Sequence, residues 1–298
     1  MGYLSNEQKG ALCAITSGIF YSFVGYFGMS VINADHSASN MTFWRFLVSS
    51  ALISFILIPR FKAINENFLE MLKMLIYGAV FYGVGVVMYF VSSKYIGTGL
   101  AMVIFFTYPA MVMFLNWLLY KKGMIKTCYL SIFIITVGLI LLVDISEFKL
   151  DIVGVGLSIL SAILYAFYIV FSKKSKLSAL VSTYMVCIGC TIASLMLALV
   201  DQSFAVPMTL SVWINILGIG IICTALPILL LLEGLKRISA EKASILSVLE
   251  PVFVVIFGVT LLGEKINLLQ CLGIITVLLG ALITLFDRRL MDNGIFQK

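Results

Sequence analysis

The chain has 298 residues, of which 62% are hydrophobic and only 11% are charged. Soluble domains carry charge on about a quarter of their residues, so this composition excludes a soluble globular enzyme and makes the bilayer the solvent. The formal net charge of +6 would suit nucleic acid or anionic lipid only if the basic residues formed clusters.

Ten apolar windows are long enough to cross the hydrocarbon core, which takes about 20 helical residues. In chain order they cover residues 10–32, 41–59, 74–92, 97–120, 127–143, 152–171, 179–200, 212–232, 241–262 and 268–286. Only Ser92–Ile96 separates the third window from the fourth, and the fifth is short. The sequence therefore predicts an all-α integral membrane protein with ten transmembrane helices.

The basic residues of the loops test this count, because cytoplasmic loops collect Lys and Arg. Sixteen lie on the side of the N-terminus, and three, Lys94, Lys149 and Lys265, lie on the opposite side. This asymmetry predicts ten spans in the inner (plasma) membrane, with both termini in the cytoplasm. It also explains the basic charge without a nucleic-acid partner.

The six cysteines all lie in apolar stretches, where a disulfide framework is not expected. Cys187 and Cys190 share one helical face, but no histidine or second cysteine pair accompanies them. No metal or other cofactor is therefore expected. The nucleotide-binding motif GxxxxGK[ST] does not occur either, which argues against transport driven by ATP within this chain.

The two halves of the chain resemble each other, as in transporters that build a central site from repeats. At an offset of 144, the first span matches the sixth through the pairs Ile15/Ile159, Ser17/Ser161, Ile19/Ile163, Tyr21/Tyr165, Phe23/Phe167 and Phe27/Phe171. From Lys94 to Gly138, seven further residues match at an offset of 142. Each half holds five spans, an odd number, so residues 1–145 and 146–298 are predicted to be inverted repeats around a central cavity.

The segment Leu232–Phe286 carries Glu-Pro at Glu250–Pro251 and Gly-Glu-Lys at Gly263–Lys265. With these motifs the chain resembles the ten-helix EamA-type members of the drug/metabolite transporter superfamily. It departs from the pattern at Tyr21 and Tyr165, where related proteins often carry Trp. The resemblance implies a cavity lined by both halves, with the fifth and tenth helices at the periphery and often at a homodimer contact. It implies no specific solute.

Small, hydroxylated and aromatic residues recur at helical spacing on one face of five spans, where lipid exposure of polar groups would be costly. The candidates for substrate binding on these faces are Tyr21, Tyr82, Phe105, Tyr108, Tyr165, Ser247 and Glu250. A cavity walled by aromatic rings suits a modest organic solute with an aromatic or cationic part. The alternative is helix packing, with tyrosines bonding between helices.

Glu250 is the sharpest candidate for a functional side chain. A ninth helix that starts near Glu241 places this carboxylate about nine residues into the membrane, near the midplane. Pro251 frees the carbonyl of Ser247, and Pro109 stands at the equivalent point of the fourth span, so both prolines are candidate breaks or hinges. The carboxylate is expected to bind a cationic group or to carry a proton, and a structural hydrogen bond is the alternative.

Arg45 is the only basic residue in the interior of a span, since Lys242 stands at the very start of the ninth window. With Trp44 it is expected at the outer mouth of the cavity, where it would attract an anionic or carboxylate group. Snorkelling towards the interface, paired with Asp35, is the alternative. Pro227 corresponds to Gly85 by the repeat offset, so these two residues are candidate hinges, with a static kink as the alternative.

Together these features predict a secondary transporter of a small organic metabolite, either amino-acid-like or an organic cation, that works by alternating access and exports its solute. The expected partners are the solute, the lipid bilayer and a second copy of the chain. Two other functions stay open: uptake of a nutrient of the same size, and a pore or scramblase. A membrane enzyme would need a nucleophile with a base, a metal cluster or paired carboxylates, and the sequence shows no such pattern.

Overall fold

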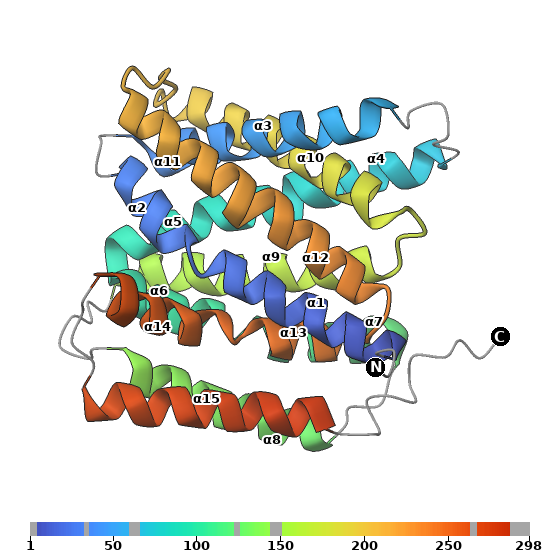
Figure 1. The fold of residues 1–298 in the computed structure, drawn as a ribbon, viewed down its shortest axis with the longest axis vertical. Helices are drawn as coiled ribbons and strands as arrows, with labels where there is room; N and C mark the ends of the chain where they lie inside the picture. The colour runs from blue at the N-terminus through green and yellow to red at the C-terminus, as the bar shows by residue number, and fades with distance from the viewer. Residues whose placement is uncertain are drawn as a thin grey trace.

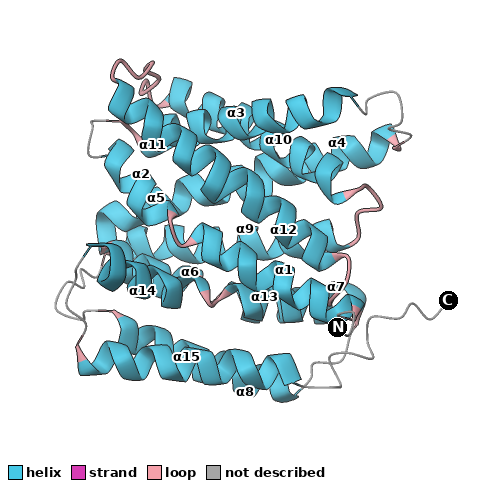
Figure 2. Ribbon diagram, viewed as in Figure 1, coloured by secondary structure: helices cyan, strands magenta, loops and turns pink. Residues whose placement is uncertain are grey.

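The computed structural model describes residues 5–32, 36–59, 66–121, 126–143, 151–262 and 267–286. All regular elements within these ranges are helices, and they run side by side across the molecule (Figures 1 and 2). Nine helical stretches in the described ranges are long and apolar enough to cross a membrane, and α8, Lys126–Leu142, is a shorter apolar helix. The predicted all-α membrane fold is confirmed.

Several spans consist of more than one helical segment. The first half contains α1 (Asn6–Tyr21) and α2 (Val24–Ile32), α3 (Ala38–Leu57), α4 (Phe68–Ile76) with the π-helix η2 (Tyr77–Gly83) and α5 (Val84–Ile96), α6 (Thr98–Phe105) and α7 (Tyr108–Tyr120), and α8. The second half contains α9 (Ile152–Lys173), α10 (Ala179–Val200), α11 (Leu210–Gly220) with the π-helix η4 (Ile221–Ala225) and α12 (Leu226–Leu235), α13 (Ala240–Ser247) and α14 (Glu250–Leu262), and α15 (Leu268–Phe286).

Side-chain caps begin many of these helices, because the first backbone N–H groups of a helix have no intrahelical partner. Each capping oxygen accepts from an N–H two or three residues onward, at Ser5, Ser37, Asn67, Asp151, Ser178, Thr209 and Ser239. The turn between α5 and α6 is instead the single residue Gly97, whose φ of 80° suits glycine. The prediction that Ser92–Ile96 forms the loop between these spans is wrong, because these residues form the last turn of α5.

Contacts between helices follow a two-fold pattern that relates the halves. α3 packs against α10, and α8 packs against α15, so equivalent helices of the two repeats meet each other. α1 packs on α12 as α9 packs on α5, and η4 contacts α3 as η2 contacts α10. The expected inverted repeat is therefore present in the packing.

Interruptions of the spans obey the same symmetry. The repeat offset of 142 superimposes η4 on the last five residues of η2. Gly85 and Pro227 follow these π-helices, and the carbonyl of each accepts a hydrogen bond from a serine of the other half. Ser161 Oγ donates to the carbonyl of Gly85 at 2.7 Å, and Ser17 Oγ donates to the carbonyl of Pro227 at 2.8 Å. The first span also breaks at Ser22, whereas its counterpart α9 is continuous (Figure 2).

The helices α8 and α15 form a separate layer at one edge of the bundle, at the bottom of Figure 1. Their backbones touch, since a Cβ added at Gly138 would lie 2.8 Å from the nitrogen of Val277, and one added at Gly273 would lie 2.8 Å from the carbonyl oxygen of Gly138. Small residues are the usual means of such close packing between membrane helices.

The crossing of α10 with α4 and η2 gives a test of the packing. A Cβ at Gly189 would overlap the carbonyl oxygen of Leu75 and lie 2.8 Å from the nitrogen of Ala79. Because overpacking of this kind costs about 1–3 kcal/mol, we expect Gly189→Ala to lower the unfolding temperature in detergent by several degrees. Gly156→Ala is the matched control, since its Cβ would meet nothing within 4 Å. Equal unfolding temperatures for the two variants would contradict the close contact.

Candidate functional site

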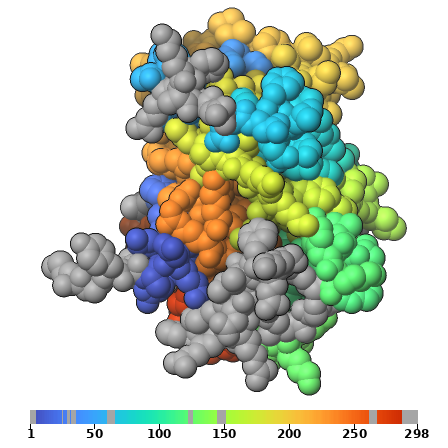
Figure 3. Space-filling view, turned by 90° about the vertical axis from the view of Figure 1, so that its right-hand side faces the viewer, coloured from blue at the N-terminus to red at the C-terminus, as the bar shows by residue number. Residues whose placement is uncertain are grey.

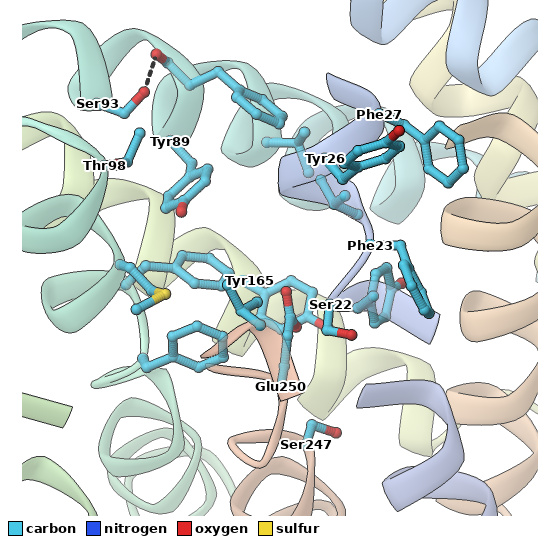
Figure 4. A pocket seen from close by; sticks show the side chains of 18 of the residues that line it. Ser22, Phe23, Tyr26, Phe27, Tyr89, Ser93, Thr98, Tyr165, Ser247 and Glu250 are labelled. Atoms are coloured by element: carbon cyan, nitrogen blue, oxygen red, sulfur yellow. Dashed lines mark hydrogen bonds between the residues drawn. The ribbon is translucent and has the colours of Figure 1, made fainter. Parts of the chain in front are cut away.

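A cavity of about 930 Å³ lies between the two halves (Figure 4). Its wall extends from the middle of the spans to the start of α2, the second half of α14, and the turn between α5 and α6, where Ser93, Thr98 and Gly99 line it. We therefore place its opening towards the end of the bundle away from the N-terminus. All seven residues predicted for substrate binding line it: Tyr21, Tyr82, Phe105, Tyr108, Tyr165, Ser247 and Glu250. The structure brings these residues together, and their role in binding stays a prediction.

Aromatic rings form one continuous wall of the cavity. The ring centroid of Tyr165 lies 4.8 Å from that of Tyr108, 5.3 Å from that of Phe105 and 5.6 Å from that of Tyr82. The hydroxyl groups of Tyr82 and Tyr21, from the third and first spans of the first half, are 2.9 Å apart and share a hydrogen bond. Faces of such rings attract cations and pack well against apolar groups.

Glu250 is the first residue of α14, directly after the break at Val248–Leu249. This break lies just before Pro251, a predicted candidate for a helix break or hinge, and the carboxylate faces the cavity, towards Tyr165 and Ser22 (Figure 4). The N-terminus of a helix carries a partial positive charge that favours an anion. The carboxylate makes no hydrogen bond or ion pair with a described residue.

Prolines occupy the second positions of the two half-helices, Pro251 in α14 and Pro109 in α7. Proline is tolerated there because the first turn of a helix needs no N–H donor. The carbonyl of Ser247, which was expected to be free for a ligand, instead lies against α1, where a Cβ on Gly18 would be 3.3 Å from its oxygen. The breaks therefore also serve as packing sites for the first span.

Arg45 lies inside the cavity wall and is only 2% exposed. Its Nε donates to Oγ1 of Thr224 at 2.6 Å, and its Nη2 donates to the carbonyl of Cys223 at 3.3 Å. Both partners belong to η4, so the π-helix holds the guanidinium group in place. Asp35, its suggested partner at the interface, lies outside the described residues.

Trp44 has a different environment from Arg45 and does not line the cavity. Its Nε1 donates to the carbonyl of Ala205 at 3.0 Å, and its ring meets that of Trp213 edge to face at 5.1 Å. The structure therefore does not bring Trp44 and Arg45 together at the cavity, because adjacent helical residues point in different directions, and their role at an outer mouth stays a prediction.

Sequence reasoning missed some of the residues that shape the site. Thr224 could have been found, because the repeat offset of 142 relates it to Tyr82. Phe23 and Phe257 also line the cavity, with their rings stacked at 4.4 Å. Phe23 is one of the residues that match between the two repeats, but nothing in the sequence pattern predicted its contact with Phe257 of the ninth span.

Polar side chains form contacts between helices at the end of the bundle opposite the cavity opening. We call this group of residues the closed end: Glu7, Asn116, Lys173, Glu241 and Lys242. Lys242 Nζ lies 2.5 Å from Glu7 Oε1 although its side chain is only 2% exposed. Asn116 Nδ2 donates to Glu241 Oε1, and Lys173 Nζ donates to the carbonyl of Ile238 at 2.9 Å. Figure 3 looks onto this end, where the α12–α13 segment in orange packs between α1 in dark blue and α9–α10 in yellow-green.

The repeat equivalents of Glu241 and Lys242 are Gly99 and Leu100, beside the cavity opening. The first half therefore has no charged counterparts of Glu241 and Lys242 beside the cavity opening.

The family assignment is clear from comparison with known proteins. A model of the EamA-like transporter family matches residues 8–144 and matches again over residues 152–286. The chain belongs to this family, and it is a multi-pass membrane transporter. The resemblance noted in the sequence is thus confirmed.

Relatives in other organisms carry only general names. The uncharacterized transporter YcbK of Bacillus subtilis is 38% identical over 55 residues, 18% of each chain. An uncharacterized transporter of Synechocystis is 27% identical over 200 residues, 64% of this chain and 60% of the relative. The uncharacterized transporter YxxF of Bacillus subtilis is 26% identical over 205 residues, 67% of this chain and 65% of the relative. The matches thus cover less than two thirds of each relative.

One crystal structure of a protein superimposes on the chain with a TM-score of 0.79. The superposition covers 94% of this chain and 98% of that protein, at 18% sequence identity. At this identity the likeness shows the fold alone.

The one-sided cavity can be tested by cysteine labelling in sealed vesicles. Ser93 lines the cavity near its opening, whereas Ser244 is fully buried near the closed end. In a background in which Cys13 and Cys271 are replaced by serine, we expect Ser93→Cys to react with an impermeant maleimide from the open side only. Ser244→Cys should stay protected from both sides. Rapid labelling of Ser244→Cys would contradict the closed end.

Proposed function

We propose that this member of the EamA-like transporter family is a secondary carrier for a small organic solute with a positively charged group, and that it works by alternating access. The observation that carries the proposal is the unpartnered carboxylate of Glu250, at a helix break in a cavity shared by both halves. The opening at one end and the polar contacts at the other support a carrier rather than a continuous pore.

The chemistry of the cavity favours a cationic group near Glu250. A carboxylate with no partner in the protein, at the wall of a cavity lined mostly by apolar and aromatic groups, gains from pairing with a bound cation. The neighbouring rings of Tyr165 and Tyr108 add cation–π attraction and apolar contact area. A volume of about 930 Å³ lies in the range that encloses a metabolite-sized molecule.

Inverted symmetry supplies the route for alternating access. A conformation that opens to the other side is obtained when the two halves exchange their roles. The segments that would bend are those where the spans are interrupted, and the candidate hinges Gly85, Pro109, Pro227 and Pro251 all lie at or next to these points. The closed end must then separate while the cavity opening closes.

The excess of Lys and Arg on the N-terminal side supports an inner (plasma) membrane orientation with both termini in the cytoplasm. In that orientation the cavity of this conformation opens to the outside. Export is the proposed direction, and uptake of the same class of solute is the alternative that a flux measurement distinguishes.

Counterflow in proteoliposomes tests the role of Glu250. The probes are radiolabelled primary amines, quaternary ammonium compounds and amino acids. Because loss of one partner of a hydrogen-bonded charge pair in a binding site costs about 2–5 kcal/mol, we expect Glu250→Gln to weaken the apparent affinity for a transported cation at least about 30-fold. Glu70→Gln, which removes an exposed carboxylate paired with Lys73, should leave exchange unchanged.

Three other results would speak against this proposal. If Glu250→Gln leaves exchange unchanged, the carboxylate of Glu250 has a structural role rather than a role in binding. Flux that does not saturate would indicate a pore, and the absence of exchange for every probe would refute the carrier itself.

The closed end gives a second test. Glu7→Gln leaves the buried ammonium group of Lys242 without its anionic partner, so the closed end should separate more readily. We expect faster maleimide labelling of Ser244→Cys from the N-terminal side in this variant. Lys73→Gln, which removes an exposed ion pair, is the matched control and should not change the rate. An unchanged labelling rate in Glu7→Gln would show that this pair does not hold the end closed.

A further inference from the structure

Aromatic rings and lysines meet on the outer surface of the bundle, where α7 and α9 end beside the closed end. Phe114 and Trp117 of α7 are 48% and 44% exposed, and their ring centroids lie 5.8 Å apart. Exposed rings on a membrane span have lipid as their solvent. We call this group of residues the α7–α9 rim: Phe114, Trp117, Tyr120, Lys121 and Lys174.

The depth of the rim matches the boundary of the bilayer. α7 begins at Tyr108, near the middle of the span Thr98–Tyr120. At about 1.5 Å per helical residue, Trp117 lies roughly 14 Å and Lys121 roughly 20 Å from this point. Half of the hydrocarbon core measures about 15 Å, so Trp117 lies at its edge and Lys121 lies among the lipid head groups.

Both lysines of the rim lie over aromatic rings. Lys174 Nζ is 3.3 Å from the ring centroid of Tyr120, and Lys121 Nζ is 5.9 Å from that of Trp117. Lys174 is the C-cap residue of α9, which packs against α7, so its side chain crosses from one helix to the other. Because Tyr120 and Lys121 are adjacent in the chain, both ammonium groups gather at the same helix end.

No described acidic residue neutralises the rim. The ion pairs among the described residues include neither Lys121 nor Lys174. The neighbouring helix α13 contributes Glu241, but its Oε1 already accepts from Asn116 Nδ2. An ammonium group has three N–H donors, and a ring face covers only one side of it. Each lysine therefore keeps donors for an anion.

We propose that the α7–α9 rim binds an anionic phospholipid, with the phosphate on its two lysines and an acyl chain along Phe114 and Trp117. A soluble acidic partner could meet the lysines but not the rings inside the membrane. A phospholipid presents an anion and an apolar chain at these two depths.

The position of the rim gives the bound lipid a structural effect. α7 also carries Asn116, which holds Glu241 in the closed end. A phosphate shared by Lys121 and Lys174 ties α7 to α9 beside this contact. In the proposed carrier, on which this step rests, the lipid therefore stabilises the conformation that is closed on this side.

Quenching of Trp117 fluorescence tests the binding. The chain has three tryptophans, and replacing Trp44 and Trp213 by Phe leaves Trp117 alone. Vesicles of phosphatidylcholine receive a small, equal fraction of brominated phosphatidylglycerol or brominated phosphatidylcholine. Because each lysine contributes about fivefold to binding of an anionic lipid, we expect a preference for phosphatidylglycerol of roughly 25-fold, which Lys121→Gln with Lys174→Gln should abolish.

Matched variants separate the rim from general surface charge. Tyr120→Phe keeps the ring under Lys174 and should keep the preference, whereas Tyr120→Leu should lower it. Lys9→Gln removes an exposed cation of α1 that forms no ion pair with a described residue, and it should change nothing. Native mass spectrometry of the unaltered chain, comparing retained phosphatidylglycerol with phosphatidylcholine, gives the same comparison without the tryptophan replacements.

The proposal is overturned if both brominated lipids quench Trp117 equally in the protein that keeps its lysines. It is also overturned if the preference survives loss of both rim lysines, or if Lys9→Gln lowers it as much as they do.

The effect on the closed end has its own readout. In the cysteine background used above, Ser244→Cys should react more slowly from the N-terminal side in phosphatidylglycerol vesicles than in phosphatidylcholine vesicles. Loss of both rim lysines should remove this difference. Equal rates in the two lipids would refute the stabilising effect, while quenching still decides the binding. Neither readout requires a transported solute, so failure of the carrier proposal would be seen separately in counterflow.

Discussion

Every feature of this site depends on one constraint of the bilayer: a backbone N–H or C=O group inside it must find its partner within the protein. An interrupted span is therefore stable only where protein groups or a cavity meet the freed atoms. Hydroxyl groups stand beside the interruptions here: Ser22 Oγ donates to Ile19, Thr107 Oγ1 to Ile104, and Tyr108 Oη to Ser244. Two of these residues that stabilise the breaks, Ser22 and Tyr108, also line the cavity.

The same breaks give the site its chemistry. A continuous ninth helix would have placed Glu250 in mid-helix, with no dipole to favour its charge. The break instead makes it the first residue of α14, where the helix N-terminus stabilises an anion. In the eighth span, the π-helix brings Thr224 and the carbonyl of Cys223 to Arg45, on a different helix. Irregular backbone thus positions both charges, while regular helices supply the aromatic wall.

Sequence periodicity predicted the part of this structure that regular helices create. Tyr21, Tyr165 and Phe105 follow helical spacing on apolar spans, so their meeting at a common cavity could be expected. Interruptions could not be located in the same way, because a π-helix shifts the register by one residue without changing hydropathy. The position of Arg45 was missed for a related reason. Its partner Thr224 lies 179 residues away, and only the folded η4 brings the two together.

In the proposed carrier, differences between the halves would decide which way the cavity faces. Identical repeats would give the two facing conformations equal free energy, so any bias must come from positions where the repeats differ. Lys242 pairs with Glu7 at the closed end, whereas its counterpart beside the opening is Leu100, which cannot form an ion pair. The first span is broken at Ser22, whereas its counterpart α9 is continuous, so the two halves also differ in this part of the cavity wall. A bias of about 1.4 kcal/mol already populates one conformation tenfold over the other. Under the proposed mechanism, a few such differences between the repeats would be sufficient to give a symmetric scaffold a preferred resting side.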